Sequence, residues 1–479
     1  MPRLAQTYLG ASPQQALCIL PYPRRQRFVP TGECFMSWLP DELFTQIFEY
    51  LAPPDHFYHE SKYGECLDYP CVNNRWLRLY QPILYRKIDL GYSGWKSAYR
   101  LKRLARTLGQ CPHLADHVRA IRIFLPTPKD AYIPIIAEIV ACCRLLREFS
   151  ENTEYSALIW PIFHAASGLP RLEKLWLAGQ TSGPALQMLL THFDLPTLKE
   201  VCLHRFGVGI DDGPGAPWYP TANTPHDDLI QILANTRHHN VTTMDLSDPS
   251  APPHITEIFM QWPAHLTNFS MDFLANSACG REYTFEAVQR LLDLHSQSLR
   301  NVRLGIIPCW HTQNGIPDFS AFPRLQSLQL SKYNLLSEPP YLASPKLRAP
   351  SLRHLRIYFN TEDQHSESAR EFATEQVRWL NDFVSHKASE TKVLETIFIG
   401  FSPETHRWSI NPDHDTIWPW DYLEQAAEAL AHQNITLRYS TPGCTREEWR
   451  QTLSVLREAR NAAIDPETID AHFGRLGVR

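Results

Sequence analysis

The sequence predicts an α/β fold in which a short helical unit precedes a solenoid with a parallel sheet and outer helices. A short unit recurs along most of the chain: an apolar residue, two others, an apolar residue, one other, and an apolar residue. Segments with the apolar spacing of helices separate many of these units. Such repetition favours stacked repeats over a single rounded core, which also suits the length of 479 residues.

The spacing of the units indicates the kind of repeat. Successive copies start 26, 43, 25, 33, 26, 27 and 42 residues apart, at Leu172/Leu175/Leu177, Leu198/Val201/Leu203, Val241/Met244/Leu246, Leu266/Phe269/Met271, Leu299/Val302/Leu304, Leu325/Leu328/Leu330, Leu352/Leu355/Ile357 and Leu394/Ile397/Ile399. Val118/Ile121/Ile123 is an earlier copy, and Leu146 and Phe149 begin another. Several spacings fall in the window of about 20–29 residues that is typical of leucine-rich repeats, and the longer ones indicate inserted loops.

The strand and helix signals fit this interpretation physically. The last two apolar residues of each unit are two positions apart, so they point to one face of a short strand. One strand cannot bury that face alone, whereas stacked strands with helices behind them bury a continuous core. Helical spacing appears in "PALQMLLTHF", "HDDLIQILANT", "TFEAVQRLLDLH" and "EQVRWLNDFVSH", and "DYLEQAAEALAHQNITLRY" predicts a last helix and strand. The alternative is a generic α/β domain whose strands are similar by chance. Chance similarity is hard to obtain in nine copies of the unit.

The repeat departs from the standard leucine-rich pattern in one respect. An asparagine usually follows the strand and bonds neighbouring turns. Only Asn360 fits that offset, and the other copies have Gln180, Phe206, Pro249, Leu274, Ile307, Tyr333 and Ser402. We therefore expect an irregular array.

Composition limits the location and the partners. The net charge of −5 provides no basic field for a phosphate backbone, so nucleic acid is not an expected partner. The 11 scattered cysteines contain no CxxC pair, which favours reduced thiols and a cytoplasmic or nuclear location, or both. We expect no signal peptide, because the longest early apolar run, Ala16–Leu20, is too short. We expect no membrane partner, because the best apolar segment, 131–143, has only 13 residues and contains Pro134 and Glu138.

A predicted helix stands just before the array, in "SWLPDELFTQIFEYLAPPDH", residues 37–56. Pro40 suits the first helical position, the acidic residues after it suit the helix start, and Pro53 and Pro54 end the helix. Its apolar residues follow helical spacing, at Leu43, Ile47, Phe48 and Leu51. By itself this pattern is as consistent with plain core packing as with a binding function.

A second segment, "CVNNRWLRLYQPILYRKIDL" at residues 71–90, changes that balance. Val72 and Trp76 lie on one helical face, and the alternating Ile88 and Leu90 predict a strand. Together the two segments resemble the F-box family, particularly its fungal members, over about 55 residues. The repeats extend the resemblance to F-box/leucine-rich-repeat proteins over most of the chain. The sequence departs from the family in the long polar segment "HFYHESKYGECLDYP" and in Asn73, where the family often has Cys.

The resemblance implies a specific function. F-box proteins bind a small Skp-type adaptor, which joins them to a cullin scaffold, so the chain is expected to be the substrate-recognition subunit of an SCF-type E3 ubiquitin ligase. A helix-in-groove interface with apolar anchors is expected. The adaptor-facing or supporting residues carried over from the family are Leu39, Pro40, Leu43, Ile47, Phe48, Leu51, Val72 and Trp76.

Two other functions are alternatives to this one. The first is a repeat scaffold that assembles proteins without target turnover. The second is an enzyme built on an α/β array, but the sequence has no Walker loop, GxSxG or HExxH motif. Cys111, His113 and His117 lack a fourth ligand at a recognisable spacing. We therefore expect no catalytic residue, no metal and no cofactor.

Inserted loops are the expected target-binding regions, because exposed Trp and Tyr are favoured interface anchors. The candidates lie in segments 207–225, 305–323 and 400–420, and they are Trp218, Tyr219, Trp310, Trp408, Trp418 and Trp420. For any single tryptophan the favoured alternative is that its ring packs onto the solenoid and closes its edge.

The expected organisation has four parts. Residues 1–36 form a loosely ordered N-terminal segment, 37–90 the F-box, 91–440 the solenoid, and 441–479 a C-terminal helical cap. The cap is predicted from "TREEWRQTLSVLREARNAA", which begins with a Thr cap and early Glu residues. Every repeat array needs such a cover for its open end.

Overall fold

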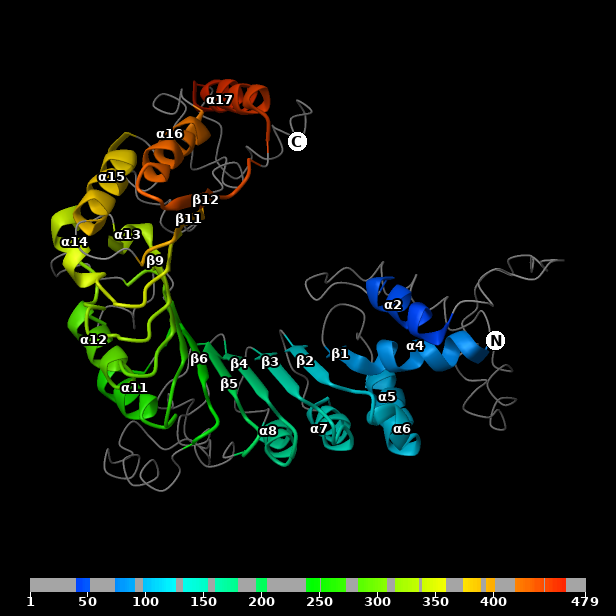
Figure 1. Ribbon diagram of the computed structural model, residues 1–479. Coiled ribbons are helices and arrows are strands. Elements are labelled where there is room, and N and C mark those ends of the chain that lie inside the picture. Colours follow the sequence, from blue (N-terminus) through cyan, green and yellow to red (C-terminus); the bar gives the residue numbers. More distant parts are fainter. Residues whose placement is uncertain are drawn as a thin grey trace.

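The computed structural model of this protein describes residues 40–51, 74–90, 98–125, 132–153, 160–179, 195–204, 238–249, 251–272, 283–307, 315–335, 338–358, 374–388, 393–400, 418–442 and 444–461. They form a curved solenoid with strands on its concave side and helices on its convex side (Figure 1). A helix pair lies at the N-terminal end and a long helix at the C-terminal end. The fold class expected from the sequence is confirmed.

The strands form one sheet in chain order, and every neighbouring pair is parallel. The 12 strands are β1 (Lys87–Leu90), β2 (Ala120–Leu125), β3 (Glu148–Thr153), β4 (Lys174–Gly179), β5 (Glu200–His204), β6 (Thr243–Ser247), β7 (Asn268–Asp272), β8 (Asn301–Leu304), β9 (Ser327–Ser331), β10 (His354–Tyr358), β11 (Thr396–Gly400) and β12 (Thr436–Tyr439). Each strand therefore follows the previous one along the arc, as stacked repeats require.

The helices of the described residues are α2 (Asp41–Leu51), α4 (Asn74–Arg86), α5 (Ala98–Gln110), α6 (Pro112–Ala115), α7 (Ile133–Cys142), α8 (Trp160–Ser167), α11 (Pro253–Met260), α12 (Phe285–Asp293), α13 (Lys332–Leu335), α14 (Pro340–Lys346), α15 (Thr374–Ala388), α16 (Pro419–Ala431) and α17 (Arg446–Asn461). Helices between the strands lie along the outer side of the arc, while α2 and α4 precede the first strand and α17 follows the last. Two predicted helical segments, "PALQMLLTHF" and "HDDLIQILANT", lie outside the described residues. No helix in the described part of the chain is long and apolar enough to cross a bilayer.

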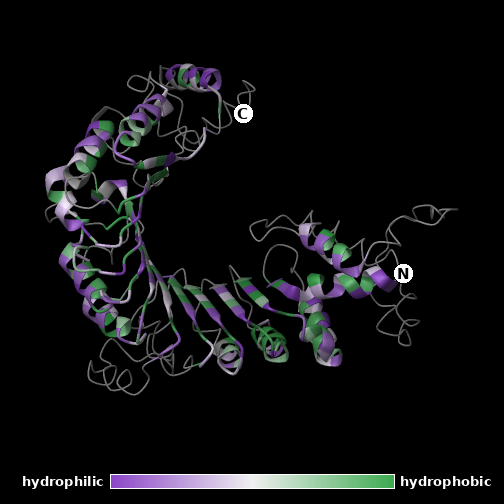
Figure 2. Cartoon of the chain, in the orientation of Figure 1, coloured by the Kyte–Doolittle hydropathy of each residue, from purple (hydrophilic) through white to green (hydrophobic). Residues whose placement is uncertain are grey.

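The core lies between the sheet and the helices. Alternate strand residues are buried, as Leu328 and Leu330 in β9 and Leu355 and Ile357 in β10 show. These are the apolar positions of the repeat unit, and Figure 2 shows polar and apolar residues alternating along the strands. The other strand residues face the concave side, which is therefore mostly polar but also carries rings such as Trp176 and Phe398.

The structure also shows what joins adjacent turns where the asparagine is missing. Asn334 lies one residue after the expected position, and its amide both accepts from the Ile307 N–H at 3.1 Å and donates to the Ile307 carbonyl at 3.2 Å. Elsewhere hydroxyls before the strands donate to carbonyls of the preceding repeat: Thr197 to Leu172, Thr267 to Thr242, Ser298 to Leu266, and Ser351 to Pro323. The array is irregular in sequence, yet its turns are still bonded.

Replacing Asn334 with alanine is expected to lower the free energy of unfolding by about 1–3 kcal/mol, because two buried backbone groups of Ile307 lose their partner. Chemical denaturation followed by circular dichroism measures the loss. The matched control is Asn301→Ala, whose amide donates to the Asn268 side chain at 2.6 Å at an exposed position where water can replace it, so a loss of at most about 0.5 kcal/mol is expected. Equal effects of the two variants would show that the Asn334 bridge adds nothing to stability.

The C-terminal helix begins as its sequence predicts. The Glu448 N–H donates to the Thr445 hydroxyl at 3.2 Å, and the Thr445 N–H donates to the Glu448 carboxylate at 2.6 Å. These reciprocal bonds form a capping box. On the buried side, Trp449, Leu453 and Val455 pack with Trp418.

Candidate functional site

The N-terminal helix pair is the first candidate site. Helix α2 packs against α4, and α4 in turn contacts α6 and leads directly into β1. In Figure 1, α4 lies between α2 and the first helices of the solenoid. One side of α2 is therefore occupied by α4, and its opposite side is turned away from α4.

An aromatic cluster holds the two helices together. Phe44 and Phe48 are buried in α2, and Tyr80 is buried in α4. The Trp76 ring lies 5.3 Å from both phenylalanine rings, measured between centroids, and the Phe48 ring lies 5.1 Å from that of Tyr80. Tilted and edge-on arrangements at these distances are favourable aromatic contacts. The pair thus has a small core of its own.

Ion pairs fix the relative position of the two helices at their surface. Asp41 contacts the Arg75 guanidinium at 2.7 Å and that of Arg78 at 2.9 Å. Glu49 contacts Arg86 at 3.4 Å. Because these side chains are partly or largely exposed, each pair adds at most about 1 kcal/mol. Their main effect is to set the register of α2 along α4.

The outward face of α2 is apolar and accessible. Leu43 is 43% exposed, Ile47 is 37% exposed and Tyr50 is 90% exposed. Their spacing of four and three residues places them on one helical face. Pro40, at the helix start, is exposed, and its carbonyl accepts the Phe44 N–H at 3.2 Å. The accessible face is therefore a short apolar strip, which we call the α2 strip and define as Leu43, Ile47 and Tyr50.

The structure distributes the expected adaptor residues over two environments. Phe48 and Trp76 belong to the cluster between the helices, so they support α2. Leu43 and Ile47 face outward. Leu51 ends α2, but its side chain, like Leu39 and Val72, lies outside the described residues. Sequence reasoning missed Phe44 and Tyr50, although the four-residue spacing of Phe44 and Phe48 was visible.

The candidate target-binding residues that the structure describes lie at the C-terminal end. Trp420 is 1% exposed, and its indole N–H donates to the Ser440 carbonyl at 3.0 Å. The Trp418 ring is half-buried and lies 4.5 Å from that of Trp420 and 6.2 Å from that of Trp449. Both rings thus pack onto the end of the solenoid, which is the alternative considered above. The remaining candidates lie outside the described residues: Trp218, Tyr219, Trp310 and Trp408.

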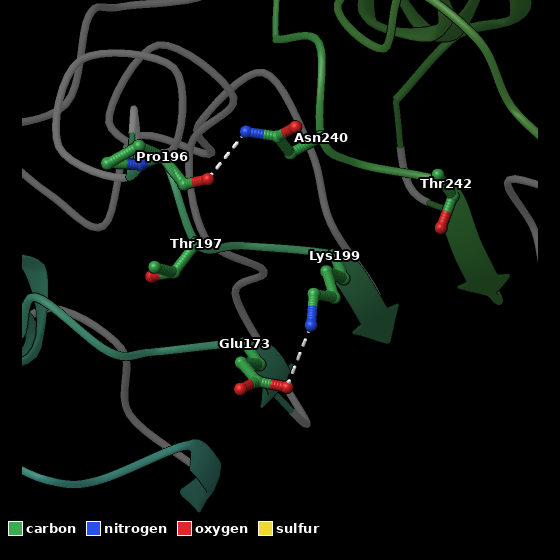
Figure 3. A pocket seen from close by; sticks show the side chains of 6 residues that line it. All are labelled: Glu173, Pro196, Thr197, Lys199, Asn240 and Thr242. Carbon is green, nitrogen blue, oxygen red and sulfur yellow. Dashed lines mark hydrogen bonds and ion pairs between the residues drawn. The ribbon is translucent and has the colours of Figure 1, made fainter.

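A cavity of about 360 Å³ lies where strands β4, β5 and β6 begin (Figure 3). Its polar groups already bond one another. Lys199 contacts Glu173 at 3.2 Å, and the Asn240 amide donates to the Pro196 carbonyl at 2.6 Å. Among the described residues, no group of three or more His, Cys, Asp or Glu side chains could hold a metal ion.

Two buried thiols are poorly suited to nucleophilic chemistry. Burial raises the pKa of Cys143 to about 12. Burial, and then the Asp245 and Glu200 carboxylates, raise the pKa of Cys202 well above its usual range. The thiolate is the reactive form of cysteine. Both side chains are therefore protonated at neutral pH and serve as packing groups.

Comparison with known proteins adds little to this description. No protein-family model and no curated protein matches the chain. One matching solved structure is the crystal structure of the Rad7 and Elc1 complex in yeast, with a TM-score of 0.31 and 11% sequence identity over 75% of this chain and 88% of that chain. Nothing about function follows from so distant a likeness. The chain's own sheet and helices identify it as a leucine-rich-repeat-like solenoid with a helix pair at its N-terminal end.

Proposed function

We propose that this chain is the substrate-recognition subunit of an SCF-type E3 ubiquitin ligase. The helix pair binds a Skp-type adaptor and, through it, a cullin scaffold, while the repeat array binds the target protein. The observation that carries the proposal is the α2 strip, an exposed apolar face on a helix whose other side is packed and ion-paired.

The α2 strip has the properties of a helix-in-groove anchor. Fully burying an exposed Leu or Ile side chain is worth roughly 1.5–3 kcal/mol. Leu43 and Ile47 are 43% and 37% exposed, so covering what remains of both contributes about 1–2 kcal/mol to an interface. The aromatic cluster and the Asp41 ion pairs hold α2 in place before binding. A preorganised helix loses less conformational entropy when it docks, which favours affinity.

The solenoid supports the second half of the proposal. Its concave sheet is a broad curved surface, the form that repeat proteins use to bind other proteins. An enzyme would need polar groups that converge on a reacting atom in a pocket. In the described cavity, Glu173 and Lys199 neutralise each other instead. We propose that the target contacts the concave surface and the loops that carry Trp218, Trp310 and Trp408.

The double variant Leu43→Asp, Ile47→Asp tests the adaptor half. It is expected to lower adaptor affinity more than about 100-fold, because two apolar anchors become charges that the groove must desolvate. Co-purification of the full chain with the Skp-type adaptor, followed by titration, measures the loss. Tyr99→Asp is the control, since Tyr99 is 66% exposed on α5, away from α2. Undiminished adaptor binding by the double variant would refute the proposal.

The second candidate function, a non-degradative scaffold, differs in the fate of the target. A ligase subunit shortens the half-life of its target, and the Leu43→Asp, Ile47→Asp variant should restore that half-life. A scaffold binds adaptor and target but leaves the half-life unchanged in both forms. Pulse-chase measurement of a co-purified target therefore separates the two functions.

A further inference from the structure

A row of arginines crosses the concave face in the C-terminal half of the sheet. The strand register aligns Arg303 of β8 with Gln329 of β9, and Gln329 with Arg356 of β10. It then aligns Arg356 with Phe398 of β11, and Phe398 with Arg438 of β12. The three arginines are exposed, while their neighbours in the strands are buried, except that Tyr439 beside Arg438 is half-buried. We call Arg303, Arg356 and Arg438 the arginine row.

The charge of this part of the sheet is one-sided. Strands β8 to β12 contain no Asp or Glu, whereas β6 and β7 contribute Asp245 and Asp272. Asp272 reaches only the first arginine, Arg303, at 4.0 Å. Among the described residues, no carboxylate pairs with Arg356 or Arg438. The positive charge is thus local, on a chain whose net charge is −5.

Aromatic rings lie beside the middle of the row. The Arg356 guanidinium lies 5.8 Å from the centroid of the Phe398 ring, and the Tyr358 ring lies 5.8 Å from the same ring. Both rings are half-buried. Stacking on Phe398 orients the planar guanidinium while its N–H groups remain available, and that planar fork matches a carboxylate.

We propose that the arginine row binds an extended acidic segment of a partner protein, with Asp or Glu at every third residue. Neighbouring strands lie about 4.8 Å apart, so arginines on alternate strands lie about 9.6 Å apart. An extended segment in the polyproline II conformation has three residues per turn and advances about 3.1 Å per residue, so every third side chain lies on the same face, about 9.3 Å from the last one. The segment crosses the strands from β8 to β12, with a carboxylate on each arginine and small spacer residues over Phe398.

The inference deepens the proposed function, because it names the chemistry that the repeat array recognises in a target. Only one part of it rests on that function: that the bound protein is a target of the ligase. A broad basic field would bind any acidic segment, whereas three spaced arginines also require a matching spacing of the acidic residues. The binding geometry can therefore be tested without the adaptor.

The test uses the full-length chain and fluorescent nonapeptides of Gly, Ser and Asp, with binding measured by fluorescence anisotropy. One peptide carries Asp at positions 1, 4 and 7, and a second has the same composition with three adjacent Asp residues. The spaced peptide is expected to bind at least fivefold more tightly. The variant Arg303→Gln, Arg356→Gln, Arg438→Gln should lose at least tenfold in affinity, since each exposed pair contributes up to about fivefold.

Matched variants separate the row from bulk charge and from folding. The control Arg106→Gln, Arg378→Gln, Arg450→Gln makes the same charge change at exposed helical positions and should leave the affinity unchanged. The substitution Arg356→Lys keeps the charge but removes the fork, and should cost about threefold. Unaltered exchange of the strand amides shows that each variant is folded.

Several outcomes would overturn the inference: equal affinity for both peptides, equal losses in the row and control variants, or binding only when the Asp residues are replaced by phosphoserine. Adaptor co-purification should be unchanged in the row variant. A chain that binds the spaced peptide but never the adaptor would refute the proposed function and leave the arginine row standing. A chain that binds the adaptor but neither peptide would refute the arginine row as a binding site and leave the proposed function standing.

Discussion

Replacing Trp420 with alanine should destabilise the C-terminal end of the solenoid by about 3–5 kcal/mol, the range for removing a fully buried tryptophan. The ring is 1% exposed and packs against those of Trp418 and Trp449. Its indole N–H also bonds the Ser440 carbonyl at the end of β12. The substitution removes the common packing partner of α16, β12 and α17, so these elements should open together.

Hydrogen–deuterium exchange is the suitable measurement, because a repeat array can open locally without unfolding as a whole. Amides of β12 and α16 should exchange faster by a factor that corresponds to the lost free energy, while those of β2 to β4 keep their rates. Trp176→Ala is the control, since that ring is half-buried on the concave side of β4. Normal protection of β12 in Trp420→Ala, with weaker target binding, would instead assign Trp420 to recognition.

Replacing Phe48 with alanine should separate α2 from α4. Phe48 is 1% exposed, and its ring contacts those of Phe44, Trp76 and Tyr80. Loss of a buried phenylalanine costs about 3–5 kcal/mol, and a cluster this small has few other contacts to hold the pair. Adaptor binding should fall with it, because the α2 strip loses the support that orients it.

Exchange of the α2 and α4 amides and adaptor titration should be measured on the same sample. In Phe48→Ala both protection and affinity are expected to fall, while the strands keep their protection. The control Tyr50→Ala, at a position 90% exposed, should leave protection intact and lower only the affinity. If Phe48→Ala binds the adaptor normally despite an unprotected α2, the helix pair is not the adaptor site.

The stacked strands could be predicted because their signal is local. Most strands show two buried residues at a spacing of two, as Leu355 and Ile357 do, and this spacing recurs from repeat to repeat. The capping box of Thr445 and Glu448 was equally visible, since both partners lie within one helical turn. The Asn334 bridge was missed because it lies one residue beyond the standard offset.

The candidate site was only partly predictable. The sequence marked Leu43, Ile47 and Phe48 as apolar residues of one helix, but it could not show that Phe48 turns inward while the other two remain exposed. That division depends on where α4 packs, and α4 is separated from α2 by more than 20 residues. The same limit applied to Trp420, whose burial depends on α17 and β12.

By itself, then, the sequence determined the repeats, the alternation of strands and helices, and the helix pair, because these follow from periodicities that neighbouring residues share. Only the tertiary structure decided which face of α2 is accessible and which polar residues meet on the sheet. Arg303, Arg356 and Arg438 are separated by 53 and 82 residues in the chain, and become a row only through the strand register. Register arises from packing between repeats, so no single segment contains it.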